Sequence, residues 1–140
     1  MIPPLRGGFT LKRFTQVAAL FFVVLSVGFA QAPGQSGGNL SHNVYFTLKD
    51  KSPQAAAKLA AACRTYLKGH PGEVFFAVGT IANDLNREVN DRDFQVSLNV
   101  VFRGKADHDR YQVDARHKRF LEENQAAWEK VRVFDSYVSR

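Results

Sequence analysis

Two stretches of the chain, residues 42–48 and 94–102, alternate between a mostly apolar face and a mixed face. The even-numbered positions carry the apolar side chains in both stretches. The opposite face carries Asn43, Tyr45 and Thr47 in the first stretch and Gln95, Ser97 and Asn99 in the second. Because successive side chains of a strand point to opposite sides, this period of two predicts two half-buried β-strands.

A helical pattern lies between these two strands. Ser52 is a suitable N-cap, and Pro53 is tolerated in a first helical turn. The apolar positions that would share one stripe of this helix are Ala55, Leu59, Ala62, Cys63 and Tyr66. The sequence Gly-His-Pro-Gly at residues 69–72 ends the helix, because proline cannot continue it and glycine accepts left-handed geometry. Residues 73–81, rich in valine and phenylalanine, predict another strand, and the polar residues 83–92 predict a loop.

The last third of the chain predicts two more helices and a closing strand. After Gly104, residues 106–113 indicate a short helix, and Asp114 is a candidate cap for a second one from Ala115 to about Lys130. The positions that would share one face of this second helix are His117, Phe120 or Leu121, Asn124 and Trp128. Residues 131–138 predict the final strand.

The element order is therefore β-α-β-β-α-β, which predicts an α+β, ferredoxin-like fold with an antiparallel sheet. In this fold the helices cover one face of the sheet. The other face, which includes Tyr45 and Gln95, is too mixed for a core and too aromatic in places for free solvation. A second sheet packed there would bury it, so we expect a homodimer.

The N-terminal segment, residues 1–32, differs in composition from the rest. It contains Arg6, Lys12 and Arg13, no acidic residue, and an apolar run of 14 residues from Val17 to Ala30. This order is typical of a signal peptide, with cleavage after Ala32 or Ala30, since a membrane span needs roughly 20 apolar residues. Residues 33–41 predict a flexible linker. We expect an exported protein, periplasmic or secreted, or a membrane-tethered one if the segment is an uncleaved anchor.

Charge and motifs exclude several classes of function. The formal charge of the 140-residue chain is +6, of which +3 belongs to residues 1–32. The remaining +3 gives no reason to expect a nucleic-acid partner. Phosphate-binding glycine loops, nucleophile elbows and Cys/His clusters are lacking, and the single cysteine, Cys63, is expected to be structural. His70 and His108 are expected at the surface, and no metal or cofactor is expected, because Asp107, His108 and Asp109 do not face one another on a helix.

Four short motifs resemble one known family. They are His42-x-Val-x-Phe-x-Leu48, Val78-Gly79, Tyr111-x5-His117-x2-Phe120 and Val133-Phe134-Asp135. Over residues 42–138 the chain resembles the stress-responsive A/B barrel domain family. The resemblance implies a ferredoxin-like subunit, two of which pack sheet against sheet into a dimeric α+β barrel.

The same resemblance implies candidate site residues. Many members have no established activity, but one branch contains olivetolic acid cyclase, which closes a polyketide by aldol condensation without a metal. A strand histidine, a helix tyrosine and a helix histidine line its pocket, and the matching residues are His42, Tyr111 and His117. Tyr111 and His117 are six residues apart, about 240° on an unbroken helix, so they converge only if the helix breaks between them.

Three functions remain open at this point. The first is an exported domain of uncharacterised activity that binds a small apolar ligand. The second is a cofactor-free, polyketide-cyclase-like enzyme with His117 as base, Tyr111 as donor to the enolate oxygen and His42 as a pocket group. The third is a haem-binding or oxygenase-like dimeric barrel.

Overall fold

The computed structural model describes residues 38–139. The elements, in chain order, are β1 (Asn39–Leu48), α1 (Pro53–Leu67), β2 (Glu73–Thr80), β3 (Val96–Phe102), α2 (Lys105–Val113), α3 (Ala115–Asn124), a 3-10 turn (Gln125–Ala127) and β4 (Trp128–Val138). The predicted N-terminal signal or anchor lies outside the described residues, as does most of the linker. Within residues 38–139, no helix combines the length and the apolar character that a membrane crossing requires.

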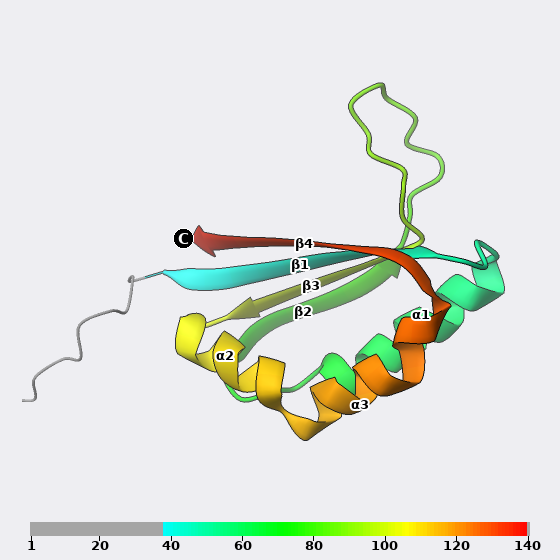
Figure 1. The fold of residues 1–140 in the computed structure, drawn as a ribbon. Coiled ribbons are helices and arrows are strands. Elements are labelled where there is room, and N and C mark those ends of the chain that lie inside the picture. Colours follow the sequence, from blue (N-terminus) through cyan, green and yellow to red (C-terminus); the bar gives the residue numbers. More distant parts are fainter. Residues whose placement is uncertain (1–37, 140) are drawn as a thin grey trace, which may run out of the picture. The chain divides into compact units, whose positions relative to one another are not determined.

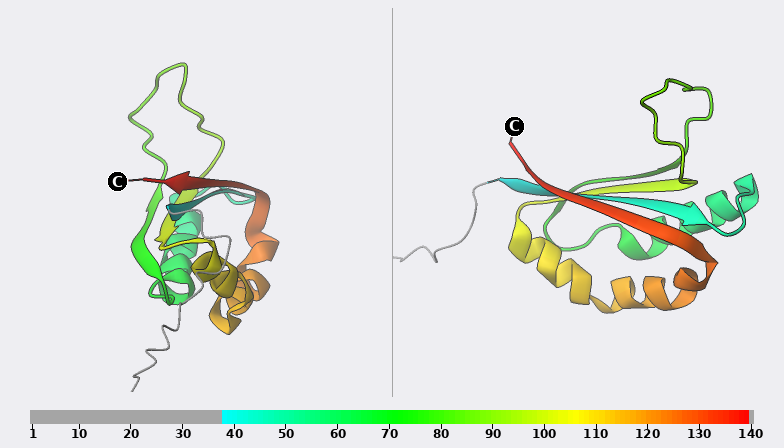
Figure 2. Two further views of the ribbon diagram at one scale, coloured as in Figure 1. Left: turned by 90° about the vertical axis from the view of Figure 1, so that its left-hand side faces the viewer. Right: turned by 45° about the horizontal axis from the view of Figure 1, so that its top comes forward.

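The four strands form one antiparallel sheet in the order β2-β3-β1-β4. The three helices lie on one side of this sheet (Figures 1 and 2). The α+β, ferredoxin-like fold predicted from the sequence is thus confirmed. Because β1 is an inner strand, its residues have neighbours on both sides, and His42 lies opposite both Val100 of β3 and Asp135 of β4.

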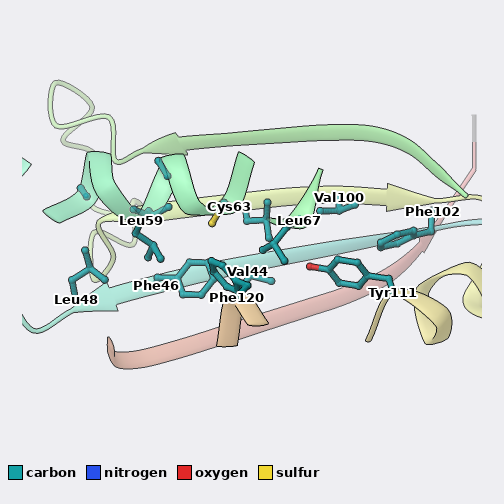
Figure 3. Close-up of a cluster of buried hydrophobic side chains, with 14 of the residues drawn as sticks. Val44, Phe46, Leu48, Leu59, Cys63, Leu67, Val100, Phe102, Tyr111 and Phe120 are labelled. Carbon is teal, nitrogen blue, oxygen red and sulfur yellow. The ribbon is translucent and has the colours of Figure 1, made fainter. Parts of the chain in front are cut away.

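The core lies between the sheet and the helices. The even-numbered residues of β1 and β3 point into it, as the alternation predicted (Figure 3). The predicted stripe of α1 is displaced by one position at several sites, since the buried residues are Ala56, Leu59, Ala60, Cys63 and Leu67. Ala55, Ala62 and Tyr66 are only partly buried. Alanine occupies so many positions of this helix that the hydrophobic pattern alone does not fix which face packs inward.

The end of α3 also differs from the sequence prediction. The helix stops at Asn124 rather than near Lys130, and Trp128 begins β4 instead of sharing a helix face with His117. The backbone amide of Lys49 donates to the carbonyl of Ala127 at 3.0 Å, which ties the turn to the end of β1. The register of the β1-β4 pairing also shifts at this point, between Thr47 and Leu48. This contact between segments distant in sequence ends the helix, so local periodicity did not predict it.

The other face of the sheet is free of helices. It exposes Phe75 to 53% and Phe134 to 54%, and the predicted loop between β2 and β3 projects from this side (Figure 1). Thr47 is buried there because its hydroxyl donates to the carbonyl of Asp93 in the loop at 2.6 Å. Arg132 of β4 also binds the loop, through the Asp91 carboxylate and the Asp93 carbonyl.

Candidate functional site

The break between α2 and α3 positions two of the predicted site residues. Asp114 has extended backbone geometry, with a ψ of 142°, and its side chain accepts a hydrogen bond from the Arg116 amide at 2.8 Å. It is the N-cap of α3, as its position before Ala115 suggested. The change in direction at Asp114 brings the rings of Tyr111 and His117 together, with their centroids 4.5 Å apart. The helix break that the convergence of Tyr111 and His117 requires is therefore present.

A pocket of about 250 Å³ lies between the helices and the β1-β4 side of the sheet. His42, Tyr111 and His117 all line it, so the structure brings together the three residues suggested by the resemblance. Most of the remaining wall is apolar and is formed by Val44, Phe46, Leu67, Leu98, Phe120, Leu121, Trp128, Val131 and Val133, with Gln112 and Asp135 as the other polar members. The hydroxyl of Tyr111 points toward the apolar cluster formed by residues such as Leu67 and Phe120 (Figure 3).

His42 is paired with a carboxylate across the sheet. Its Nδ1 lies 2.7 Å from Oδ1 of Asp135, the residue opposite it on β4. Burial lowers the pKa of His42, and the hydrogen bond to Asp135 opposes this effect without reversing it. A neutral imidazole that donates from Nδ1 to Asp135 leaves Nε2 as a hydrogen-bond acceptor.

His117 and Trp128 carry polar atoms that lack a partner. His117 Nδ1 and Trp128 Nε1 are both buried and form no hydrogen bond with any residue in the described part of the chain. Burial lowers the pKa of His117, which favours the neutral ring. A buried polar group without a partner costs free energy, so these two atoms make this wall of the pocket less stable than a fully apolar one.

Tyr111 lies at the centre of all four histidines of the chain. Its ring centroid is 4.5 Å from that of His117, 4.9 Å from His70, 5.9 Å from His42 and 6.4 Å from His108. Burial raises the pKa of the Tyr111 phenol. The phenol is therefore protonated near neutral pH and is able to donate a hydrogen bond.

The expectation that His70 and His108 lie at the surface is wrong. His70 is buried, with Nε2 2.9 Å from the carbonyl oxygen of Tyr66, because the turn after α1 folds back under Tyr111. His108 packs against His42 and Phe102 on the inner side of α2. Neither histidine lies in a regular hydrophobic pattern, so the sequence did not predict that these two side chains are shielded from solvent.

Two further pocket residues were not assigned a site role from the sequence. Asp135 belongs to the closing motif Val133-Phe134-Asp135. The antiparallel pairing of β1 with β4 places it opposite His42. Trp128 was placed on the wrong element. Cys63 is fully buried and its pKa is raised by burial to about 12, which fits its expected structural role.

A larger hollow, of about 500 Å³, lies on the open face of the sheet below the β2-β3 loop. Its wall includes Tyr45, Arg87, Asp91, Arg132 and Phe134. None of the three predicted site residues lines it. We therefore place the candidate site in the smaller pocket, where the histidines and the tyrosine converge.

Several solved structures share this fold. A dimeric ferredoxin-like protein of unknown function from Thermobifida fusca is 13% identical, with a TM-score of 0.61 over 76% of this chain and 97% of its own. A Dabb family protein from Mesorhizobium loti is 21% identical, with a TM-score of 0.59 over 74% and 99%. The hydroxynitrile lyase of Passiflora edulis is 22% identical, with a TM-score of 0.59 over 74% and 95%. At these identities the likeness shows the fold alone.

Sequence comparison identifies the family. No curated protein matches the chain. The family model described as the stress responsive A/B barrel domain matches residues 40–138, which is well over half of the chain. This match confirms the resemblance carried by the strand, helix and closing motifs. The chain belongs to the stress responsive A/B barrel domain family.

Proposed function

We propose that the pocket binds a small, mostly apolar carbonyl compound and that His117 and Tyr111 perform cofactor-free enolate chemistry on it. The observation that carries this proposal is the His117 ring beside the Tyr111 ring on the wall of an apolar pocket, where burial lowers the pKa of His117. An unprotonated imidazole nitrogen is a base, and a buried phenol is a hydrogen-bond donor. Their proximity is the arrangement that proton abstraction next to a carbonyl requires.

The proposed reaction is an intramolecular aldol addition, the bond-forming step of an aldol condensation. The neutral His117 imidazole takes a proton from the carbon between two carbonyl groups, and the Tyr111 hydroxyl donates a hydrogen bond to the enolate oxygen. The enolate carbon then attacks a second carbonyl of the same chain. A carbon–carbon bond forms, and the new alkoxide takes the proton back from His117. His42, oriented by Asp135, holds a polar group of the substrate through Nε2.

The size and walls of the pocket favour a small ligand. A volume of about 250 Å³ lies below the range of about 300–1,000 Å³ that is common for pockets of drug-sized ligands. Val131 and Val133 of the edge strand line the pocket and remain 38% and 49% exposed, so the pocket opens beside β4. An apolar tail would leave along this opening. The haem alternative gains no support here, because a macrocycle needs more room.

We further propose that two chains pack through the open faces of their sheets. Two phenylalanine side chains, Phe75 and Phe134, are more than half exposed on this face. Solved structures with the same fold, including those from Thermobifida fusca and Jannaschia, are dimeric ferredoxin-like proteins. Burial of these aromatic side chains in a second copy removes a large apolar area from water.

Export remains part of the proposal and rests on the sequence of residues 1–32 alone. The basic, apolar and small-residue order of this segment supports removal by a signal peptidase. An exported domain would meet its ligand outside the cytoplasm.

The catalytic roles predict how two substitutions act on a linear β-polyketo thioester with an alkyl tail. His117→Ala removes the base and should reduce turnover by at least about 100-fold. Tyr111→Phe keeps the ring and removes the donor, and should also lower turnover. Product formation by chromatography measures both effects. The free energy of unfolding of His117→Ala should stay within about 1 kcal/mol of the parent value.

Matched controls separate chemistry from folding. Lys118→Ala alters the exposed neighbour of His117, and Tyr66→Phe removes a hydroxyl that binds Glu123 outside the pocket. Both controls should turn over the thioester at the parent rate. Lack of turnover by the parent protein, or equal rates for His117→Ala and Lys118→Ala, would contradict the proposed chemistry.

The dimer proposal predicts twice the chain mass in light scattering at micromolar concentration. Phe134→Lys places a charge in the buried face and should shift the population toward the monomer. Val113→Lys is the control, because Val113 is 65% exposed on the helix side of the molecule. A monomeric parent protein, or equal dissociation of both variants, would refute packing through the sheet face.

Export predicts a shortened chain outside the cytoplasm of a bacterial host. Mass spectrometry of the protein from that fraction should show an N-terminus after Ala30 or Ala32. Recovery of the whole chain, including Met1, only from the cytoplasm would contradict export.

A further inference from the structure

Three residues with metal-ligating side chains converge next to the pocket. His42 comes from β1, His108 from α2 and Asp135 from β4, so a helix and two paired strands each contribute one residue. One potential ligand atom from each residue lies within 4.8 Å of the other two. The His42 and His108 ring centroids are 4.9 Å apart. Only the fold creates this group, since 93 positions separate His42 from Asp135 along the sequence.

The cluster borders solvent on one side. The side chain of His42 is only 6% exposed and that of His108 only 15%, whereas that of Asp135 is 46% exposed. His108 and Asp135 also line a second pocket, of about 260 Å³, on the side of Asp135 away from Val133. One buried and one partly buried imidazole behind an accessible carboxylate provide fixed ligands together with a path for an ion to enter.

We propose that His42, His108 and Asp135 form a binding site for a divalent first-row transition-metal ion. Imidazole nitrogen and carboxylate oxygen together suit Zn²⁺, Co²⁺, Ni²⁺ and Fe²⁺, and two histidines with one carboxylate are a recurrent facial ligand set. Bonds of about 2.1 Å place the ligand atoms about 3 to 4 Å apart. The three candidate atoms lie within 4.8 Å of one another, so small side-chain rotations are enough to reach this spacing.

Neighbouring residues favour a fixed cluster over a mobile surface group. The Gln112 side-chain nitrogen lies 3.0 Å from Nε2 of His108, and this contact holds the ring in place. Lys105 is the nearby cation on the second pocket, but its ammonium binds the Asp109 carboxylate at 2.5 Å. The Asp109 carboxylate therefore balances the positive charge of Lys105 and reduces its repulsion of a bound cation.

Three protein ligands leave coordination positions open. The open positions face the space beside Asp135, where water or an oxygen atom of a small molecule completes the coordination. A carbonyl or carboxylate oxygen is the chemical class that such an ion binds. This site goes beyond the proposed enolate chemistry, which takes its base and its donor from His117 and Tyr111 and requires no metal. The two share His42 and Asp135, so a bound ion would replace the hydrogen bond between these side chains.

Cobalt titration tests the site directly. The full chain without an affinity tag is stripped with EDTA, dialysed and titrated with Co²⁺, whose visible absorption bands report coordination by nitrogen and oxygen. We expect saturation at one ion per chain, and loss of the bands when Zn²⁺ is added. His108→Phe and Asp135→Asn should each weaken Co²⁺ binding by at least about tenfold.

Two controls identify the ligands. Glu129→Gln alters another exposed carboxylate of β4, which pairs with Lys51, and His117→Ala removes a pocket histidine outside the cluster. Both should bind Co²⁺ as the parent does, and far-UV circular dichroism verifies that each variant is folded. Asp135→Asn keeps the shape of the side chain and provides the test if His108→Phe does not fold.

The outcomes are decisive for the metal site alone. Absence of saturable Co²⁺ bands in the parent would overturn it, as would equal affinity in Asp135→Asn and Glu129→Gln. Co²⁺ binding retained by a His117→Ala variant that has lost turnover supports both proposals separately. Co²⁺ binding by a parent protein that never turns over the thioester supports the metal site and contradicts only the enolate chemistry.

Discussion

The capped break at Asp114 determines whether this domain has a polar site at all. On one continuous helix, six residues of rotation would leave Tyr111 and His117 pointing in directions about 120° apart, and only one of them would reach the sheet. The Asp114 side chain accepts a hydrogen bond from the Arg116 amide, and such a cap stabilises a helix start by about 1 kcal/mol. With the chain turned at this residue, both rings enter the same apolar pocket. The geometry of the site thus depends on one short-range hydrogen bond.

The sheet contributes the other half of the site through strand pairing. His42 and Asp135 are direct neighbours in the β1-β4 register, so the hydrogen bond between them follows from the same pairing that builds the fold. Burial lowers the pKa of His42 and His117, and the Asp135 carboxylate orients His42. A site of this kind combines a base and a donor in an apolar surrounding without needing a cofactor. The same fold carries other activities, as the hydroxynitrile lyase shows, so function depends on these side chains and not on the fold.

Sequence patterns predicted the fold, and the family resemblance suggested the three residues that the structure brings together at one pocket. The patterns failed where distant contacts decide. Alternation located β1 and β3, and the residue order located Asp114. The burial of His70 and His108 was missed, because a turn folding back and a helix packing on a strand leave no period in the sequence. The sequence pattern assigned Trp128 to a helix. In the structure Trp128 pairs with Leu48 at the end of β1, and this contact, rather than local propensity, ends α3. The role of Asp135 became visible only from the register.

The central claim is that the fold buries a neutral histidine, His117, as a base beside a protonated tyrosine. Nitrogen-15 NMR of the imidazole rings, recorded with EDTA while the pH is varied, measures its protonation directly. Because burial lowers the pKa of His117, its ring should remain neutral at pH values where an ordinary histidine, with a pKa of about 6.5, is already half protonated. A His117 that titrates at or above the ordinary value would contradict the account.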